Sequence, residues 1–599
     1  MNISLKKVFL LFLGVFSFFS CKNEENTVVE NLSQYVEPRI GTAHCRWFHF
    51  APGAMPFGMA KPAPSTNGSL GNKSGWEATG YDYRDNTIEG FPCLHEFQIG
   101  GISLMPTVGE LLTVPGLPSD TIKTGYRSRF SHENEVVKPG YYSVLLDDYQ
   151  IQAELTATER VAFQRFTFPQ GQEKHILFNI GNRQGESGAV KDAYVVYNQD
   201  GTVEGWVITE PEYVKKYQPG AVVPLYFSAV LDKEPLDYGA YNGNVQQSGV
   251  RESKGVGAGM YFSFASENQE IVTAKIGLSY TSVENARLNL QQEASDLDFD
   301  RAKERAQATW EDYLGRIRVE TECREDKVKF YTGLYHALLG RGLASDVNGA
   351  YPRNDGSVGQ LPMKEGTPLY NIYNTDAAWG AQWNLSQLWI LAYPEYMSEY
   401  ISSHLQAYKD AGWLADGLAN NRYVSGVGTN LLSTIIAGAY ECGIRDFDTK
   451  TAYEACLKNE LEGKNRPFGA GKVNTTEFVK YGYVPHQDTG EGYHETFMFS
   501  ASHTLEYSYS AWAVAQWAKQ LGDEAHYSQL MDLSKGWERL YDSSCNFIRP
   551  KKADGKFVDN FFQEGNAWQY TFYVPHDVKS LVAKMGADEF NLRLDSIFT

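Results

Sequence analysis

The chain has few cysteines and fewer basic than acidic residues. Its 599 residues include 7 cysteines, none in the Cys-x-x-Cys spacing of a zinc knuckle. The 54 Lys and Arg are outnumbered by 73 Asp and Glu, which argues against nucleic-acid binding because phosphate contacts need clustered cations. The sequence also lacks a Gly-x-Ser-x-Gly elbow, a Walker-type phosphate loop and a His-Glu-x-x-His pair. These absences argue against serine hydrolases, nucleotide hydrolases and zinc proteases.

Long apolar runs are scarce as well, and the clearest one lies at the N-terminus. Lys6 and Lys7 precede a mostly apolar run over residues 8–19. As a helix this run is about 18 Å long, too short for the roughly 30 Å core of a bilayer. We therefore predict a signal peptide over residues 1–21, with Cys21 lipidated and the membrane reached by that lipid anchor only. An ordinary cleaved signal is the alternative, and the six later cysteines permit disulfides without establishing them.

Turn signals and hydrophobic periodicity divide the rest of the chain. Residues 22–34 are polar and are expected to form a tether. Residues 35–285 contain many short runs rich in β-branched and aromatic residues, which predicts a β-sandwich domain. Residues 286–320 are rich in Ala, Glu, Gln and Arg and are expected to form a helical linker.

The hydrophobic period becomes helical after about residue 320. Val328, Tyr331 and Leu334 begin one apolar helical face, and roughly eight or nine helices follow in residues 321–599. Successive helices joined by loops predict an (α/α)6-type toroid. The fold class is therefore a multidomain β + α protein, with an N-terminal β-sandwich followed by a helical toroid. The expected helices are too few to close that toroid, so we expect the toroid to be partial and the sequence to be a C-terminally truncated part of a longer one.

Residues 560–577 are the most informative segment for function. Glu564 precedes a Gly-Asn turn and is followed by Trp568 and Tyr570. Apolar neighbours raise the pKa of a carboxyl, which lets it hold a proton for a leaving oxygen near neutral pH. Aromatic faces stack on sugar rings, and amides bind sugar hydroxyls. The segment thus favours carbohydrate chemistry, although a solvated turn acid beside core aromatics remains the alternative.

Several segments also resemble one known family, in the same order along the chain. Glu564-Gly565-Asn566-Ala567-Trp568-Gln569-Tyr570 and Val574-Pro575-His576-Asp577 resemble the signature of glycoside hydrolase family 92. The other matching segments are Tyr35–Thr42, Pro52–Met59, Gly80–Tyr83, Ile88–Phe91, Pro139–Tyr142, Thr156–Arg160, Ser282–Arg287, Phe330–Thr332, Gly412–Leu414 and Thr504–Tyr507. The resemblance covers most of residues 35–599.

The resemblance implies a calcium-dependent, inverting exo-α-mannosidase acting on glycans or oligosaccharides. Glu564 would be the general acid. The residues that we associate with the substrate are Trp76, Glu77, His95, Trp379, Trp568, His576 and Asp577, and the candidate Ca²⁺ ligands are Gln563, Asn566 and Gln569. Glu24 and Glu25 resemble a surface-export tag of Gram-negative glycan degraders, which implies an outer-membrane or cell-surface lipoprotein, with the periplasm as second choice.

Inverting hydrolysis also requires a carboxylate that activates water, about 6.5–9.5 Å from the acid. The family's base lies in a Gly-Asn-Asp-Asp-x-Gly-Gln motif that does not occur here, so we expect the base beyond Thr599. Asp488, Glu491 and Glu495 are weaker alternatives. His486, Asp488, His494 and Glu495 also superficially resemble a transition-metal cluster, although loop or subsite polar residues are the simpler interpretation.

Two segments depart from the family's pattern. Residues 379–383 read Trp-Gly-Ala-Gln-Trp where the family has Trp-Asp-Thr-x-Arg, and residues 91–96 lack its Ser-His-Thr-His-Leu run. These departures leave open a glycosidase for another sugar or linkage, a non-catalytic glycan-binding lipoprotein, and a lyase or phosphorylase on a similar toroid. Trp379 and Trp383 lie four residues apart and could equally be core, as could Trp76.

Overall fold

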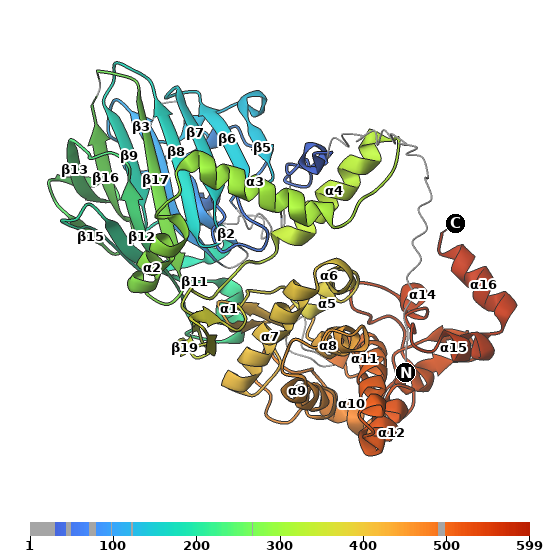
Figure 1. Ribbon diagram of the computed structural model, residues 1–599. Coiled ribbons are helices and arrows are strands. Elements are labelled where there is room, and N and C mark those ends of the chain that lie inside the picture. The colour runs from blue at the N-terminus through green and yellow to red at the C-terminus, as the bar shows by residue number, and fades with distance from the viewer. Residues whose placement is uncertain are drawn as a thin grey trace, which may run out of the picture.

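A computed structural model describes residues 30–43, 49–70, 80–96, 99–120, 124–265, 267–488 and 497–598. A strand-rich half and a helical half lie side by side, joined by two helices that cross one face of the strands (Figure 1). The predicted signal peptide, Cys21 and most of the tether lie outside the described residues. Within the described part, no helix has the length and apolarity to cross a membrane.

The strand-rich half contains two antiparallel sheets. The nine-stranded sheet has the order β15 (Glu252–Lys254), β10 (Ala189–Tyr197), β11 (Val203–Glu210), β12 (Val223–Leu231), β17 (Glu270–Ser279), β8 (Val161–Phe168), β7 (Ile151–Ala157), β6 (Tyr141–Leu146), β5 (Val136–Lys138). The six-stranded sheet has the order β14 (Val245–Ser248), β13 (Asp237–Asn242), β16 (Ala258–Phe264), β9 (Lys174–Asn179), β3 (Ile99–Val108), β2 (Phe91–Glu96).

The two sheets pack face to face, as the sequence predicts for a sandwich. Buried and partly exposed residues alternate along β7, β11 and β12, which is the period of a strand with one face in a core. The rings of Phe178 on β9 and Phe227 on β12 stack between the sheets, with their centroids 6.5 Å apart. Their side chains are fully buried. This contact places the core between the two layers.

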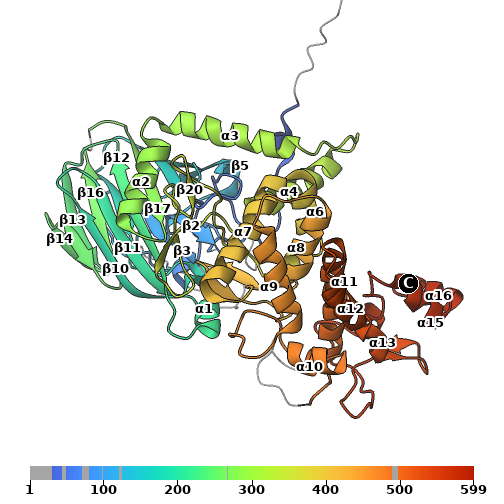
Figure 2. The same cartoon turned by 60° about the horizontal axis from the view of Figure 1, so that its bottom comes forward.

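The linker consists of helices α2 (Val283–Ala294) and α3 (Phe299–Gly315). Each helix begins at a side-chain cap: Ser282 accepts from the Asn285 amide and Asp298 accepts from the Arg301 amide. α2 packs on β17 and β12 (Figure 2). Trp310 of α3 is fully buried, and its indole nitrogen donates to the Ala54 carbonyl at 2.7 Å. The linker is therefore part of the folded body and not a flexible connection.

The second half of the chain is helical, as the sequence predicts, but it contains more helices than expected. From Arg324 onward the described residues contain thirteen α-helices, more than the eight or nine expected. These are α4 (Arg324–Leu339), α5 (Ala378–Ala381), α6 (Leu385–Ala392), α7 (Pro394–Ala411), α8 (Leu432–Glu441), α9 (Thr449–Leu461), α10 (Thr475–Tyr481), α11 (Ser500–Gln520), α12 (Glu524–Leu533), α13 (Gly536–Leu540), α14 (Ala567–Tyr570), α15 (Val578–Met585) and α16 (Ala587–Ser596). The extra helices are mostly short, and pattern analysis either merges them with their neighbours or misses them.

Helix α11 is the centre of the helical half. It packs against α8, α9, α12 and α13, and most of its residues are buried. Short two-stranded antiparallel sheets lie among the loops: β1 (Thr87–Ile88) with β4 (Ser128–Arg129), β18 (Ala350–Pro352) with β19 (Val358–Gln360), β20 (Met363–Lys364) with β21 (Thr367–Pro368), β22 (Gly417–Ala419) with β23 (Arg422–Val424), and β24 (Tyr541–Asp542) with β25 (Phe547–Ile548).

Polar contacts fasten the two halves together. Arg160, in the turn between β7 and β8, donates from Nε to the Ser345 carbonyl at 2.7 Å and pairs with Glu293 of α2 at 2.8 Å. From the short helix α1 (Glu212–Tyr217), the Tyr217 hydroxyl donates to the Ser425 carbonyl at 2.8 Å. Both Arg160 and Tyr217 are buried, so these bonds fix the orientation of the sandwich relative to the helices.

The five cysteines among the described residues are all free thiols: Cys93, Cys323, Cys442, Cys456 and Cys545. The disulfides that the even cysteine count permits therefore do not form among them.

Candidate active site

Glu564 lies at the tip of a tight turn. Phe562 and Gly565 form an antiparallel bridge that closes the turn, and Glu564 has a left-handed backbone with φ of 52°. Asn560 and Phe561, just before it, are also left-handed, both with φ of 64°. Such backbone is uncommon in residues other than glycine and gathers at functional sites. The Glu564 side chain is exposed, so its carboxyl is not enclosed by the apolar neighbours that the sequence suggests.

The residue before the acid is anchored to helix α11. The backbone nitrogen of Gln563 donates to the Ser502 hydroxyl at 3.0 Å, and the backbone carbonyl of Gln563 accepts from the Tyr570 hydroxyl at 2.6 Å. The Gln563 side chain is 3% exposed, yet both of its amide atoms lack a hydrogen-bond partner in the described part of the chain. A buried polar group without partners is costly. Gln563 is therefore a strong candidate for contact with a ligand.

The residues after the acid cap the short helix α14. The Asn566 side-chain oxygen accepts from the amides of Trp568 and Gln569, and the Gln569 side-chain oxygen accepts from the Asn566 amide at 3.0 Å. This capping box fixes the turn that carries Glu564. It also occupies the side-chain oxygens of two of the three candidate calcium ligands.

A buried acid lies beneath this turn, on α11. Glu506 is 2% exposed, and one of its oxygens accepts from the indole nitrogen of Trp379 at 2.8 Å. Burial raises the pKa of Glu506 to about 7, with the negative charge of Asp416 adding to the rise and Lys472 opposing it. The second oxygen of Glu506 makes no hydrogen bond of normal geometry among the described residues, although interaction with the Thr429 hydroxyl lowers the pKa of Glu506. Glu506 is thus a carboxyl that can hold a proton near neutral pH.

Tyr570 interacts electrostatically with both Glu506 and Glu564. Burial raises the pKa of its hydroxyl to about 12, and the charges of Glu506 and Glu564 both contribute to the rise. The hydroxyl of Tyr570 donates to the backbone carbonyl of Gln563, the residue before Glu564, at 2.6 Å. Tyr570 therefore marks the centre of the candidate site.

Glu506 gives the protein a testable pH dependence. Its pKa in the folded chain is above its ordinary value of 4.5, so its contribution to stability is fully present below about pH 4.5 and is lost as the pH rises through about 7. The shift corresponds to about 3 kcal/mol. We expect the stability of the native protein relative to Glu506→Gln to fall by about this amount between about pH 4.5 and pH 7.5. Denaturant unfolding at both pH values measures this, and parallel pH profiles would contradict the burial of an ionisable acid.

Aromatic rings extend the site away from Glu506. The Trp383 ring lies 4.9 Å from the Tyr573 ring and 6.4 Å from the Trp379 ring. His576 is half-buried, its Nε2 lies 2.9 Å from the Ser534 carbonyl, and its ring stacks on Tyr509. Burial lowers the pKa of His576. The imidazole of His576 is therefore expected to be neutral and to line the site as an aromatic ring and not as a charged group.

The remaining predicted substrate residues lie in different places. Trp568 is 43% exposed, and it packs edge-on against Phe547 on the outer side of the turn. Asp577 is half-buried at the start of α15. Trp76 and Glu77 lie outside the described residues. His95 lies on β2 in the sandwich, and its ring stacks on Phe50 at 5.3 Å.

His95 differs from the helical residues in its surroundings. Its side chain is buried, neither ring nitrogen has a partner in the described part of the chain, and burial lowers its pKa to about 3. The structure gives it no contact with Glu564, Glu506 or Trp379. Its predicted role in binding stays a prediction.

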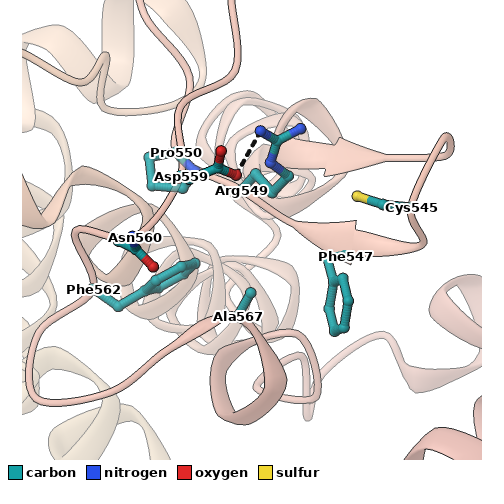
Figure 3. Close-up of a pocket in the computed structure, with 8 residues that line it drawn as sticks. All are labelled: Cys545, Phe547, Arg549, Pro550, Asp559, Asn560, Phe562 and Ala567. Carbon is teal, nitrogen blue, oxygen red and sulfur yellow. Dashed lines mark hydrogen bonds and ion pairs between the residues drawn. The ribbon is translucent and has the colours of Figure 1, made fainter.

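A cavity of about 400 Å³ lies beside the Glu564 turn (Figure 3). Asn560 and Phe562 line it from before the acid and Ala567 from after it, and the ion pair of Arg549 with Asp559 crosses its far wall at 2.7 Å. The Glu564 turn thus has this cavity on one side, and it is hydrogen-bonded to α11 through Gln563 and Ser502.

The alternatives considered for a base or a metal cluster are not brought together. Asp488 is exposed and bound by Lys552 at 2.8 Å and by His486 at 3.1 Å. The Lys552 hydrogen bond lowers its pKa. Glu491, His494 and Glu495 lie outside the described residues. Within the described ranges, no group of three His, Cys, Asp or Glu side chains could hold a metal ion. Of the candidate calcium ligands, Gln563 alone presents a buried, unpartnered side-chain oxygen.

A β-sandwich packed on a helical toroid, with acids and aromatic rings gathered at one site, is typical of glycosidases. The family model described as the glycosyl hydrolase family 92 N-terminal domain matches residues 35–279, and the family's catalytic domain matches residues 285–599. The chain belongs to glycoside hydrolase family 92, and it is a glycosidase.

Individual relatives agree with this assignment. A family GH92 α-mannosidase from Bacteroides thetaiotaomicron has a TM-score of 0.83 at 26% identity, over 95% of this chain and 75% of that chain. Its complex with mannoimidazole has a TM-score of 0.83 at 25% identity, over 95% and 74%. An uncharacterized secreted glycosidase of Arthroderma benhamiae is 26% identical, over 94% of this chain and 73% of that protein.

Sequence reasoning missed Glu506. It lies in Thr504-Leu505-Glu506-Tyr507, a segment that was recognised as similar to the family but was given no role. The available signal was that Glu506 is the single acid in a long helix that is rich in small and aromatic residues. An ionisable residue in such a helix is buried only with partners or a shifted pKa.

Proposed function

We propose that the protein is an exo-acting α-mannosidase that releases mannose from glycans with inversion, and that Glu564 is the general acid. The observation that carries this proposal is the construction of the Glu564 turn. A bridge, a capping box and the Ser502 anchor all fix the backbone of one exposed carboxyl. Fixed geometry is what proton transfer to a leaving oxygen requires. The α-mannosidase relatives support mannose as the sugar.

In the proposed reaction, Glu564 gives its proton to the glycosidic oxygen as the bond from that oxygen to the anomeric carbon breaks. A water molecule attacks the anomeric carbon from the opposite face and loses a proton to a base, so the configuration inverts. The buried Glu506 does not take part in this step. It holds the Trp379 indole in place through the hydrogen bond described above.

We also propose a calcium ion, as the family resemblance implies, with Gln563 as one of its ligands. Calcium takes oxygen ligands, and the buried amide oxygen of Gln563 is available. When bound, the ion would hold sugar hydroxyls. Asn566 and Gln569 are weaker candidates because their oxygens serve the capping box.

The test is mannose release from a panel of α-linked manno-oligosaccharides, measured with calcium and with a chelator. We expect release with calcium, loss with the chelator, and recovery when calcium but not magnesium is returned. Gln563→Met, which keeps the volume but removes the oxygen, should raise the calcium concentration needed for half-maximal activity by about tenfold or more. Gln520→Ala, at the exposed end of α11, is the matched control. Release that is indifferent to the chelator would overturn the calcium proposal.

A second candidate is a glycosidase of the same family that acts on another sugar or linkage. Three positions differ from the family's pattern. Gly380 replaces its acid, Ala381 replaces its hydroxyl, and the exposed Trp383 replaces its guanidinium group. The same panel with gluco- and galacto-linked oligosaccharides decides between the two candidates.

We propose further that the protein is a lipoprotein exposed at the cell surface or outer membrane and anchored through Cys21. The secreted relative supports export from the cytoplasm. The signal-like residues 1–21 supply the anchor.

A further inference from the structure

An unusually exposed tryptophan stands at the edge of the candidate site. Trp383 is 49% exposed, although a tryptophan stabilises a fold mainly by being buried. It follows the short helix α5, which contains Trp379. Trp379 of α5 donates to Glu506 of α11, and the Trp383 ring lies 4.9 Å from the Tyr573 ring, so this segment packs against α11 and against the residues that follow α14.

The orientation of the Trp383 ring is fixed from two sides. The Tyr573 ring is tilted by 40° against it, and Trp379 meets it nearly at a right angle, at 85°. The second of these is an edge-to-face arrangement that aromatic pairs favour. Trp383 therefore presents a defined ring surface to solvent.

The rings of Trp379 and Tyr573, which contact Trp383, each interact with a buried polar side chain. Trp379 donates to Glu506 at 2.8 Å, and the Gln382 side chain lies 3.4 Å from the Tyr573 hydroxyl. Gln382 and Glu506 are both buried. A surface built in this way loses little side-chain entropy when a ligand binds.

The chemistry of this surface fits a sugar ring. It is aromatic rather than aliphatic, and aromatic faces match the apolar face of a pyranose. Tyr573 is three residues from Tyr570, whose phenol donates to the backbone carbonyl of Gln563 at 2.6 Å, directly before Glu564. The surface thus lies near the turn that carries Glu564, the proposed proton donor. Its exposure suits a sugar that remains partly in solvent, unlike the enclosed ring that an exo-glycosidase releases.

We propose that Trp383 and Tyr573 form a stacking platform for a second pyranose of the glycan, beyond the residue that is released. The proposal rests on the proposed function for the position of this sugar relative to the cleaved bond. The platform makes the enzyme prefer oligosaccharides over simple monosaccharide glycosides, because only the former reach Trp383.

The experiment measures binding and not turnover, in the Glu564→Gln background so that the ligand is not consumed. Titration calorimetry compares methyl α-mannoside with α-linked mannotriose. We expect Trp383→Ala to weaken mannotriose binding about tenfold and to leave methyl α-mannoside unchanged. Trp383→Phe should restore most of the affinity, whereas Trp383→Leu should not, because it keeps an apolar side chain without a ring. Leu391→Ala, an 83% exposed residue of α6, is the control.

Three results would overturn the platform: equal losses for both ligands, no loss for either, or equal affinities of the Phe and Leu variants. Failure of the proposed function is distinguishable. In that case neither mannoside binds the parent protein, and the same variants are measured with gluco- and galacto-oligosaccharides. A ring-dependent loss there supports the platform and rejects mannose, whereas no ring-dependent binding of any of these glycans rejects both.

Discussion

Replacement of Glu564 by Gln is expected to reduce kcat/KM for unactivated manno-oligosaccharides by about 10² to 10⁴-fold, the usual contribution of a general acid. The amide keeps the size and the turn but has no proton to give. A glycoside with a dinitrophenyl leaving group needs no such proton. We therefore expect its hydrolysis to be nearly unchanged in the same variant. The ratio of the two losses, measured by steady-state kinetics, is the decisive quantity.

A structural role for Glu564 predicts a different pattern. Equal losses on both substrates would show that the variant disturbs the turn and not the proton transfer. Glu270→Gln, an acid on strand β17 of the sandwich that pairs with Lys233, is a control in which one carboxyl is removed outside the site. Its activity on both substrates should match the native protein.

Replacement of Lys472 by Met is expected to lower the free energy of unfolding by about 3–5 kcal/mol, the usual cost of leaving one charge of a buried pair uncompensated. Lys472 and Glu460 are each 1% exposed, with their charged atoms 2.5 Å apart. Ser510 of α11 also donates to Glu460, at 2.9 Å. The pair thus connects α9, the segment before α10, and α11. Denaturant unfolding at neutral pH measures the loss.

The double variant Lys472→Met with Glu460→Gln separates charge from packing. It removes both charges while keeping the volumes, so we expect it to recover most of the lost stability. A double variant no more stable than Lys472→Met alone would show that packing dominates. Because the lysine charge also opposes the raised pKa of Glu506, Lys472→Met should raise that pKa further.

Much of the fold could be predicted from periodicity. Helix α11 is 21 residues long, and α7 begins at Pro394 and ends before a left-handed Gly412. Both helices carry strong local signals. The short helices α5, α13 and α14 have four or five residues, too few for a hydrophobic period to be read. The number of helices was therefore underestimated.

The site was predicted unevenly for the same reason. Glu564 and its capping residues are contiguous, so one segment of sequence contains them. The hydrogen bond of Trp379 with Glu506 joins residues that are 127 positions apart, and no local pattern reports such a pair. The free thiols likewise show that an even cysteine count does not bring cysteines together.

The sequence by itself determined the order of a strand-rich and a helical half, the family resemblance, and the turn that carries Glu564, because each depends on neighbours in the chain. Tertiary structure alone decided which groups surround that turn. Packing of α11 against the segment that follows Asn560 buries Glu506 and raises its pKa, the buried Gln563 side-chain amide has no partner among the described residues, and Trp383 stays exposed. Burial is a property of the assembled fold, and pKa values and ring exposure follow from burial.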